Sequence, residues 1–352
     1  MMNKIMMKGT EAIGEAAIRA GCRLYFGYPI TPQSELTEYM ARRLPQVEGT
    51  FLQAESEVAA VNMIYGASSV GKRVMTSTSS PGFSLMQEGV SYIACAQLPS
   101  VFVNVVRGGP GLGDIQPSQG DYFQATKGGG HGDYKLLVLS PSTVQEAADL
   151  TGVAFELADK YRNPVLIFAD GLLGQMMEPV SFSDKEVSYD NSSWALTGAK
   201  NRPARQVTSF NIDPYGLEKM NLELQKKYKL MEENEIRYET TLTEDADILI
   251  VAHGTMGRIA KSVVDMARKD GLKVGLFRPI TLYPFPYEAL RKSAADVSLV
   301  LTVEMSSGQM LEDVRLAIAE RTRVEFYGRM AGVVPMPLEI YEVLKQKIGR
   351  RS

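Results

Sequence analysis

The chain has 352 residues, 45% hydrophobic and 22% charged, with a formal net charge of −3, and this length suggests about two folded domains. The slightly acidic balance argues against nucleic acid as a partner, because duplex-binding proteins usually carry a basic patch. No stretch approaches the roughly 18 apolar residues of a membrane-spanning helix, and the first residues mix lysine with glutamate, unlike a signal peptide. We therefore expect a cytoplasmic protein without membrane contact.

In chain order, the pattern predicts a helix at 10–20, a strand at 23–26, a helix at 34–44, a strand at 50–53, a helix at 56–70, a strand from 73, a helix at 82–97, strands at 100–106 and 134–140, a helix at 143–161 and a strand at 163–170. Strands separated by helices imply crossover connections, and so a mostly parallel sheet.

The sequence changes character between about 180 and 244, where a polar stretch is followed by a charged helical segment at 217–239. The α/β alternation then resumes, with strands expected at 246–254, 273–279, 297–304 and 323–329 and helices at 257–271, 286–294 and 308–320. The sequence therefore predicts an α/β fold of two domains with mostly parallel sheets. We place them at 1–185 and 245–352, joined by a linker and surface helix at 186–244.

Metal-binding residues are scarce. The chain has two cysteines, Cys22 and Cys95, and two histidines, His131 and His253. Neither cysteine lies in a CxxC pair, whereas zinc and iron–sulfur centres need about four ligands. Isolated cysteines are more often small buried side chains. We therefore predict no metal or cluster site on this chain.

Four unusual segments each follow a predicted strand. They are GYPITP at 27–32, QAESEVAAV at 53–61, SSPGFSLMQE at 79–88, and a long glycine-rich loop that begins RGGPGLG at 107–113. In parallel α/β sheets, ligands bind at the carboxyl ends of the strands. We therefore expect these segments to surround a functional site.

The glycine-rich loop is not a nucleotide fingerprint, because it lacks the lysine of GxxxxGK[ST] and does not open a helix as GxGxxG does. Arg107 lies at its root, and a guanidinium suits a carboxylate because its planar fork binds two oxygens. The loop is thus either a mobile substrate-side loop or a flexible surface connection. Glu57, in the first turn of an almost uncharged helix, also has two interpretations. It is a cofactor-binding acid, or simply a first-turn acid favoured by the helix dipole.

Five stretches resemble one family together. They are GYPITPQSE, QAESEVAAVNMIYGAS, TSTSSPGFSLMQEGVSYIA, VRGGPGLGDIQPSQGDYFQATKGGGHGDY and DGLLGQMMEP. The chain resembles the alpha subunit of the 2-oxoacid:ferredoxin oxidoreductases, which are thiamine-diphosphate enzymes. Its motifs are most similar to the VorB type, which acts on 3-methyl-2-oxobutanoate (2-oxoisovalerate). The 2-oxoglutarate enzymes are near relatives.

This resemblance implies a thiamine-diphosphate pyrimidine-binding domain followed by a transketolase C-terminal-like domain. The GDG…N signature of a magnesium-bound diphosphate is absent from the sequence. The diphosphate and magnesium are therefore expected on a beta subunit, and iron–sulfur clusters on other partners. The implied assembly contains a gamma subunit and a ferredoxin-like delta subunit, forms a dimer of heteromers, uses coenzyme A as co-substrate and passes electrons to ferredoxin.

The resemblance also assigns roles to single residues. Glu57 would share a proton with N1′ of the cofactor's aminopyrimidine, which then acts as the base at the thiazolium C2. Thr31, held between two prolines, and Arg107 would bind the 2-oxoacid. Gly82 would permit close approach to the cofactor, and Phe83 would stack or pack beside it. Ser80 departs from the SGPG found in many relatives, because this chain has SSPG.

The resemblance implies oxidative decarboxylation of a branched-chain 2-oxoacid to the acyl-CoA. The nearest alternative is the same reaction on 2-oxoglutarate. Two further alternatives are a non-catalytic scaffold subunit, which the retained Glu57 disfavours, and a stand-alone thiamine-dependent decarboxylase, which the missing diphosphate signature disfavours.

Overall fold

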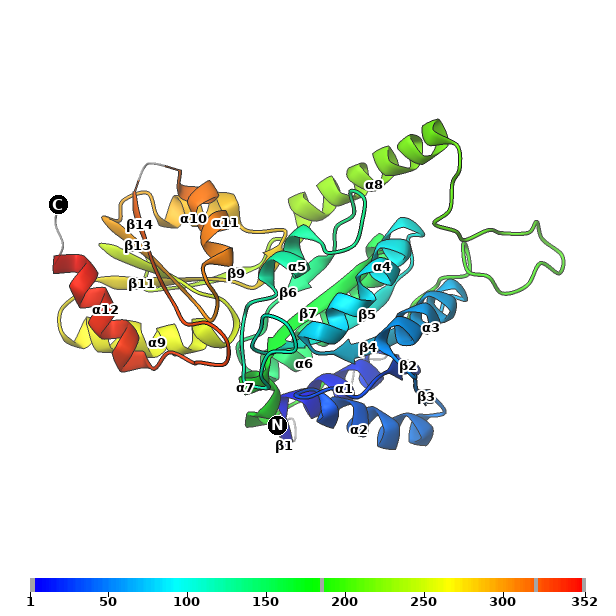
Figure 1. Cartoon of the computed structure of the whole chain (residues 1–352), viewed down its shortest axis with the longest axis horizontal. Helices are drawn as coiled ribbons and strands as arrows, with labels where there is room; N and C mark the ends of the chain where they lie inside the picture. Colours follow the sequence, from blue (N-terminus) through cyan, green and yellow to red (C-terminus); the bar gives the residue numbers. More distant parts are fainter. Residues whose placement is uncertain (1–3, 184–186, 320–321, 350–352) are drawn as a thin grey trace.

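The computed structural model describes residues 4–183, 187–319 and 322–349. These residues form two lobes, each built on a β-sheet, with the long helix α8 (Pro214–Asn234) running along the first lobe (Figure 1). The α/β class predicted from the sequence is confirmed. No helix in the described ranges has the length and apolar character needed to cross a membrane.

The larger sheet has seven strands in the order β12-β6-β7-β5-β4-β2-β3. Its strands are β2 (Leu24–Gly27), β3 (Thr50–Gln53), β4 (Val74–Thr78), β5 (Ser100–Val106), β6 (Leu137–Leu139), β7 (Pro164–Asp170) and β12 (Thr281–Tyr283). All neighbouring pairs are parallel except β12, which runs antiparallel to β6. Parallel pairing fits the alternation of strands and helices in the first half of the sequence.

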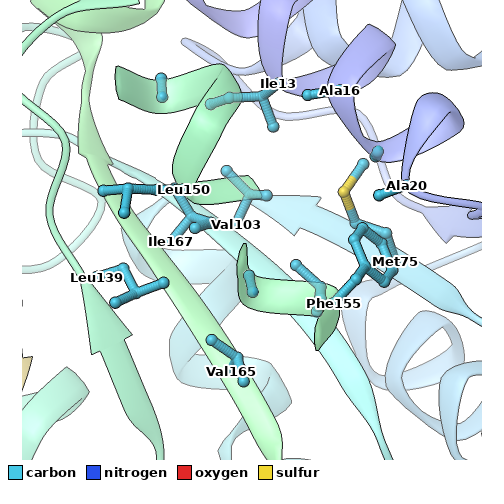
Figure 2. Packing of buried hydrophobic residues seen from close by; sticks show 14 of the residues in the cluster. Ile13, Ala16, Ala20, Met75, Val103, Leu139, Leu150, Phe155, Val165 and Ile167 are labelled. Carbon is cyan, nitrogen blue, oxygen red and sulfur yellow. The ribbon is translucent and has the colours of Figure 1, made fainter. Parts of the chain in front are cut away.

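Helices cover both faces of this sheet. One face packs against α1 (Gly9–Arg19), α2 (Ser34–Arg43) and α6 (Val144–Tyr161), and the other against α3 (Glu57–Ser69), α4 (Ser80–Cys95) and α5 (Tyr122–Lys127). Figure 2 shows the first interface, where Ile13 of α1 and Leu150 of α6 lie over Val103 and Ile167 of the sheet. Alternate residues of a strand point to opposite faces, which divides the apolar run of β5 between the two cores.

The smaller sheet has the order β14-β13-β10-β11-β9. Its strands are β9 (Tyr238–Thr241), β10 (Ile248–Val251), β11 (Val274–Pro279), β13 (Leu299–Glu304) and β14 (Arg323–Gly328). They are parallel except for the pair β9 and β11. Helices α9 (Gly254–Lys269) and α12 (Pro337–Gly349) pack on one face, and α10 (Tyr287–Ser293) and α11 (Gln309–Ile318) on the other.

The two lobes are structurally joined. β12 comes from the C-terminal third of the chain yet extends the larger sheet. One hydrophobic cluster also runs from the larger sheet through Phe102 and Phe168 to Leu249 and Val300 of the smaller one. The proposed boundaries at 185 and 244 remain a prediction, but the segment after 244 completes the sheet before it.

His253 is buried at this junction. Its ring lies between Tyr122 and Phe168, with centroids 5.8 Å away in each case, and Nδ1 is 3.0 Å from Oγ of Ser140. Burial and the nearby charge of Arg278 lower the pKa of His253 to about 3. The imidazole is therefore neutral near neutral pH, and its described role is packing between the lobes.

Several elements were not expected from the sequence. β1 (Ile5–Lys8) pairs antiparallel with β8 (Met177–Val180), next to the short helix α7 (Gly171–Gln175). A 3-10 turn (Leu44–Val47) follows α2. By contrast, the charged segment forms a helix, α8, as predicted. Its buried side chains are Leu224, Tyr228 and Met231.

Candidate active site

The sheet order places the carboxyl ends of β5, β4, β2 and β3 side by side. The four unusual segments begin at these ends, and parallel pairing puts them at one edge of the sheet. The topology therefore gathers Thr31, Glu57, Gly82 and Arg107 as the sequence predicts. Their contacts define what the site can do.

Glu57 occupies the first turn of α3. Ser56 caps this helix, because its Oγ accepts a hydrogen bond from the backbone N–H of Ala59 at 3.1 Å. The Glu57 side chain is 4% exposed, and its carboxyl makes no hydrogen bond or ion pair to any described residue. A buried carboxyl without a partner is costly in a folded chain, which favours a cofactor-binding acid over a simple first-turn acid at Glu57.

Gly82 lies directly against Glu57. A Cβ atom added at Gly82 would sit 2.4 Å from Oε1 of Glu57 and 2.1 Å from Oγ1 of Thr78. Helices α3 and α4 approach closely because Gly89 of α4 leaves room for Val61, whose Cγ1 would be 2.5 Å from an added Cβ. Val61 lies one turn beyond Glu57 on the same helix face, so this contact holds the carboxyl over Gly82.

Phe83 is fully buried within the cluster between the two sheets. The family resemblance implied that this ring stacks or packs beside the cofactor. The ring is packed in this core cluster and has no exposed face, and its place beside a cofactor stays a prediction.

Arg107 ends β5 and is 7% exposed. Its guanidinium donates hydrogen bonds to the backbone carbonyls of Thr31, at 2.9 Å, and Leu112, at 2.8 Å. Nε has no partner, and the group forms no ion pair with any described residue. The bond to Thr31 ties the GYPITP segment to the glycine-rich loop, while the positive charge stays uncompensated.

The later part of the glycine-rich loop, with the helix α5 that follows, is bonded to the smaller lobe. The backbone N–H of Gln119 donates to the carbonyl of Met305 at 2.8 Å, and Oε1 of Gln119 accepts from the N–H of Met305 at 3.0 Å. Phe123 N–H donates to Gln309 Oε1 at 2.7 Å. Lys127 forms a 2.6 Å ion pair with Asp313. The segment at 119–127 is thus bonded to the smaller lobe at several points, and the choice between a substrate-side loop and a surface connection stays a prediction.

Thr31 is exposed and lines a pocket of about 800 Å³. The apolar side chains of its wall are those of Pro32, Ile115, Pro117, Leu172 and Val334. Lys8 lines the pocket as well, but its ammonium is paired with Glu35 at 3.2 Å. Neither Glu57 nor Arg107 belongs to the described lining. The backbone carbonyl of Thr31 therefore contacts Arg107, whereas Thr31 also lines this separate pocket.

Sequence reasoning missed a polar group at the ends of β4 and β5. Ser80 Oγ accepts from the N–H of Arg107 at 3.0 Å, so the serine that departs from SGPG joins α4 to β5. Asn104 donates to Asp121 at 2.8 Å, and burial raises the pKa of that acid. Thr78, opposite Asn104 in the sheet register, is the remaining member of this polar group. In the sequence, the polar run TSTSS and the single asparagine inside the apolar strand SVFVNVV could have indicated it.

The chemistry of this arrangement is limited and specific. Glu57 can exchange a proton with a basic ring nitrogen placed over Gly82, because its carboxyl has no competing partner in the described residues. Arg107 can bind an anion with its remaining N–H groups. The described residues contain no cluster of three or more acidic, histidine or cysteine side chains that could hold a metal ion.

Comparison with known proteins gives consistent matches over nearly the whole chain. The family described as "Pyruvate flavodoxin/ferredoxin oxidoreductase, thiamine diP-bdg" matches 15–241, and "Pyruvate:ferredoxin oxidoreductase core domain II" matches 246–340. The chain is 52% identical to ketoisovalerate oxidoreductase subunit VorB of Methanothermobacter marburgensis, covering 97% of this chain and 96% of that protein. It is 36% identical to 2-oxoglutarate synthase subunit KorA of Methanothermobacter thermautotrophicus, covering 98% and 99%.

Solved structures agree. The chain superposes on 2-oxoglutarate:ferredoxin oxidoreductase from Magnetococcus marinus, which contains 2-oxoglutarate, coenzyme A and succinyl-CoA, with a TM-score of 0.89 and 28% identity. The match covers 99% of this chain and 66% of that one. A split-gene transketolase shares the fold alone, with a TM-score of 0.62, 16% identity and coverage of 98% and 99%. The chain therefore belongs to the 2-oxoacid:ferredoxin oxidoreductase family, as a subunit of a multisubunit oxidoreductase in which the thiamine-diphosphate-binding domain precedes core domain II.

Proposed function

We propose that this chain is the alpha subunit of a coenzyme-A-dependent oxidoreductase acting on a branched-chain 2-oxoacid, with 3-methyl-2-oxobutanoate as the preferred substrate. The acid and coenzyme A give an acyl-CoA and carbon dioxide, and the two electrons released pass to ferredoxin. The 52% identity to a ketoisovalerate subunit, against 36% to a 2-oxoglutarate subunit, supports this choice.

One observation carries the proposal. Two buried ionisable groups, Glu57 and Arg107, reach neighbouring strand ends without an ion pair to any described residue. They are connected through the first turn of α4, where Ser80 bonds Arg107 and Gly82 touches Glu57. Leaving such groups unpaired costs stability, and residues of this kind gather at functional sites. Their partners are therefore a cofactor and a substrate.

The residues fit the pyrimidine end of thiamine diphosphate. When bound, this cofactor supplies the carbon nucleophile for the 2-oxoacid carbonyl and accepts the electron pair left by decarboxylation. Glu57 would hold the proton at N1′, and Gly82, which has no side chain, would leave the carboxyl accessible to the cofactor. The chain lacks the GDG…N signature, so we assign the diphosphate and magnesium to a beta subunit and the iron–sulfur clusters to partners that include a ferredoxin-like subunit.

The substrate side supports a branched chain over a dicarboxylate. Arg107 would bind the carboxylate next to the carbonyl, which both substrates share. A second carboxylate needs another free cation, whereas Lys8 in the Thr31 pocket is already paired with Glu35. Thr31 connects this pocket to Arg107 through the 2.9 Å bond to its carbonyl, and Ile115, Leu172 and Val334 give the pocket an apolar wall. The partner subunit completes the substrate site.

Arg107→Ala is expected to raise the KM for the 2-oxoacid by about 10-fold to 100-fold, because a hydrogen bond to a charged group contributes about 1.5–3 kcal/mol. The KM for ferredoxin should not change. Steady-state kinetics on the assembled enzyme measures both. Arg107→Lys keeps the charge without the fork, so it should recover part of the lost affinity.

A different result would reassign Arg107. An unchanged KM for the 2-oxoacid, together with failure of the subunits to associate, would make Arg107 an interface residue. Unfolding of the isolated Arg107→Ala chain at clearly lower temperature would show that the bonds to Thr31 and Leu112 are its main role.

Reconstitution tests the proposed function. The purified chain alone is expected to be colourless, to bind thiamine diphosphate with magnesium weakly or not at all by calorimetry, and to show no decarboxylation. Combined with its partner subunits, it should reduce ferredoxin with 3-methyl-2-oxobutanoate and coenzyme A faster than with 2-oxoglutarate. Micromolar binding by the chain alone would favour a stand-alone enzyme. A preference for 2-oxoglutarate would select the alternative substrate.

A further inference from the structure

Thr78, the last residue of β4, has a buried hydroxyl without a partner. The residue is 1% exposed, and Oγ1 makes no hydrogen bond to any described residue. Threonine on a strand is common, but a buried hydroxyl normally finds an acceptor. The backbone around Thr78 is occupied by sheet pairing with β5, where Thr78 lies opposite Asn104. The unpartnered hydroxyl therefore needs an explanation outside the sheet.

The neighbour of this hydroxyl is the Glu57 carboxyl. Oγ1 of Thr78 and Oε1 of Glu57 both lie against Gly82, at 2.1 Å and 2.4 Å from the position of an added Cβ. Both residues are nearly fully buried. Neither atom is engaged by another described group. Two complementary polar atoms thus converge on the same point beside Gly82.

The Glu57 carboxyl can turn toward Thr78 without movement of its helix. The terminal torsion of a glutamate is broad, so the carboxyl plane rotates at low cost. Thr78 is stiffer, because χ1 of a β-branched residue on a strand is restricted. The threonine is therefore the fixed point, and the carboxyl is the part that turns to it.

We propose that Thr78 is a positioning residue for Glu57, whose hydroxyl donates a hydrogen bond to Oε1 when the carboxyl gives up its proton. This inference rests on the proposed role of Glu57. The proton leaves from Oε2 toward the cofactor nitrogen, Thr78 keeps its own proton, and no other bond is made or broken. A donor to a developing carboxylate stabilises it. The bond also fixes the rotation of the carboxyl, so that Oε2 points away from the sheet.

A competing acceptor lies within the sheet. Oδ1 of Asn104, the register partner of Thr78, is also buried and without a partner, while Nδ2 of the same residue is bonded to Asp121. If the hydroxyl served only Asn104, its loss would affect folding and leave Glu57 untouched. The two assignments therefore differ in what they do to proton transfer.

The test compares Thr78→Val, which removes the hydroxyl at nearly constant shape, with Thr78→Ser, which retains it. In the assembled enzyme, Thr78→Val should slow hydrogen–deuterium exchange at the cofactor C2 by about 10-fold to 100-fold, the effect of one hydrogen bond to a charged group. Thiamine diphosphate affinity should stay within about twofold, and Thr78→Ser should restore exchange. Thr78→Ala is a second hydroxyl-free variant.

Thr76→Val is the matched control. Thr76 lies two residues earlier on the same strand, is fully buried and also has an unpartnered hydroxyl, but it does not border Gly82. Both valine variants of the full chain should unfold at the same temperature as the parent or higher, because each removes an unsatisfied buried polar atom. Only Thr78→Val should slow C2 exchange.

Three results would overturn the inference. Parent-like exchange in Thr78→Val and Thr78→Ala, with slow exchange in Glu57→Gln, would refute the Thr78 role and leave the proposed function intact. A lower unfolding temperature for Thr78→Val than for Thr76→Val, with normal exchange, would assign the hydroxyl to Asn104. Normal exchange in Glu57→Gln would remove the proposed function and this inference together.

Discussion

Glu57→Gln is expected to slow turnover of the assembled enzyme by roughly 10²–10⁴-fold, the usual effect of losing a positioned proton-transfer group. Glutamine has nearly the same shape, and Glu57 has no bonded partner among the described residues, so folding should be unaffected. Hydrogen–deuterium exchange at the cofactor C2 should slow in parallel. Quenched-exchange experiments read by proton NMR measure C2 exchange, and ferredoxin reduction measures turnover.

The nearby acid Glu55 provides the control for this experiment. It precedes the cap Ser56 and is exposed, so Glu55→Gln should retain parent-like turnover and exchange. Fast exchange in Glu57→Gln together with slow exchange in Glu55→Gln would transfer the role to Glu55. Fast exchange in both would show that neither acid serves the cofactor, and the scaffold alternative would then account for the chain.

Local pattern was sufficient for most of the fold. The β-branched run SVFVNVV became β5, and the helices before and after it were found from apolar spacing, because both signals depend on near neighbours in sequence. Parallel pairing followed from the alternation of elements. The grouping of Thr31, Glu57, Gly82 and Arg107 followed in turn, since the carboxyl ends of parallel strands share one edge.

Long-range pairing was beyond the sequence. β12 has three residues, Thr281–Tyr283, and its partner β6 lies at Leu137–Leu139. Nothing in so short a run shows which sheet it joins. The pair β1 and β8 poses the same problem, because its two halves are separated by most of the first lobe. Such pairings depend on tertiary contacts that override local preference.

Within the site, the sequence identified residues but not their contacts. Arg107 was expected at a substrate, and the structure adds its bonds to the carbonyls of Thr31 and Leu112. Gly82 was expected to admit a cofactor, whereas its observed neighbours are Thr78 and Glu57. Contacts with backbone carbonyls cannot be predicted from composition or spacing, because every residue has a carbonyl. Contacts with side-chain oxygens from other elements depend on the tertiary fold.

Gly82→Ala is expected to be almost as damaging as loss of Glu57. The new methyl group would meet Oε1 of Glu57 at 2.4 Å and Oγ1 of Thr78 at 2.1 Å, far inside normal contact. The flexible Glu57 carboxyl is displaced, and because Thr78 is fixed in the sheet, a shift of α4 has to relieve the 2.1 Å contact with its hydroxyl. Turnover should fall about 10²-fold or more with the acid displaced, while overpacking costs about 1–3 kcal/mol of stability. Turnover and thermal unfolding of the variant measure the two effects.

Gly152→Ala is the matched control for this change. Gly152 also lies inside a helix, α6, but an added Cβ meets nothing within 4 Å. Its replacement should raise stability by up to about 1 kcal/mol, through the better helix propensity of alanine, and leave turnover unchanged. The contrast between the two glycines therefore separates the steric effect at the site from the general effect of the substitution.

The double variant Glu57→Gln, Gly82→Ala then shows whether the methyl group acts through the acid. If it does, adding Gly82→Ala to Glu57→Gln should reduce turnover by less than about threefold, because the function it disrupts is already lost. If the losses of turnover in the two single variants multiply fully in the double variant, Gly82 serves the cofactor directly, as the family resemblance implied. Parent-like turnover in the single Gly82→Ala variant would instead show that the carboxyl tolerates displacement, which a proton donor held at one nitrogen does not.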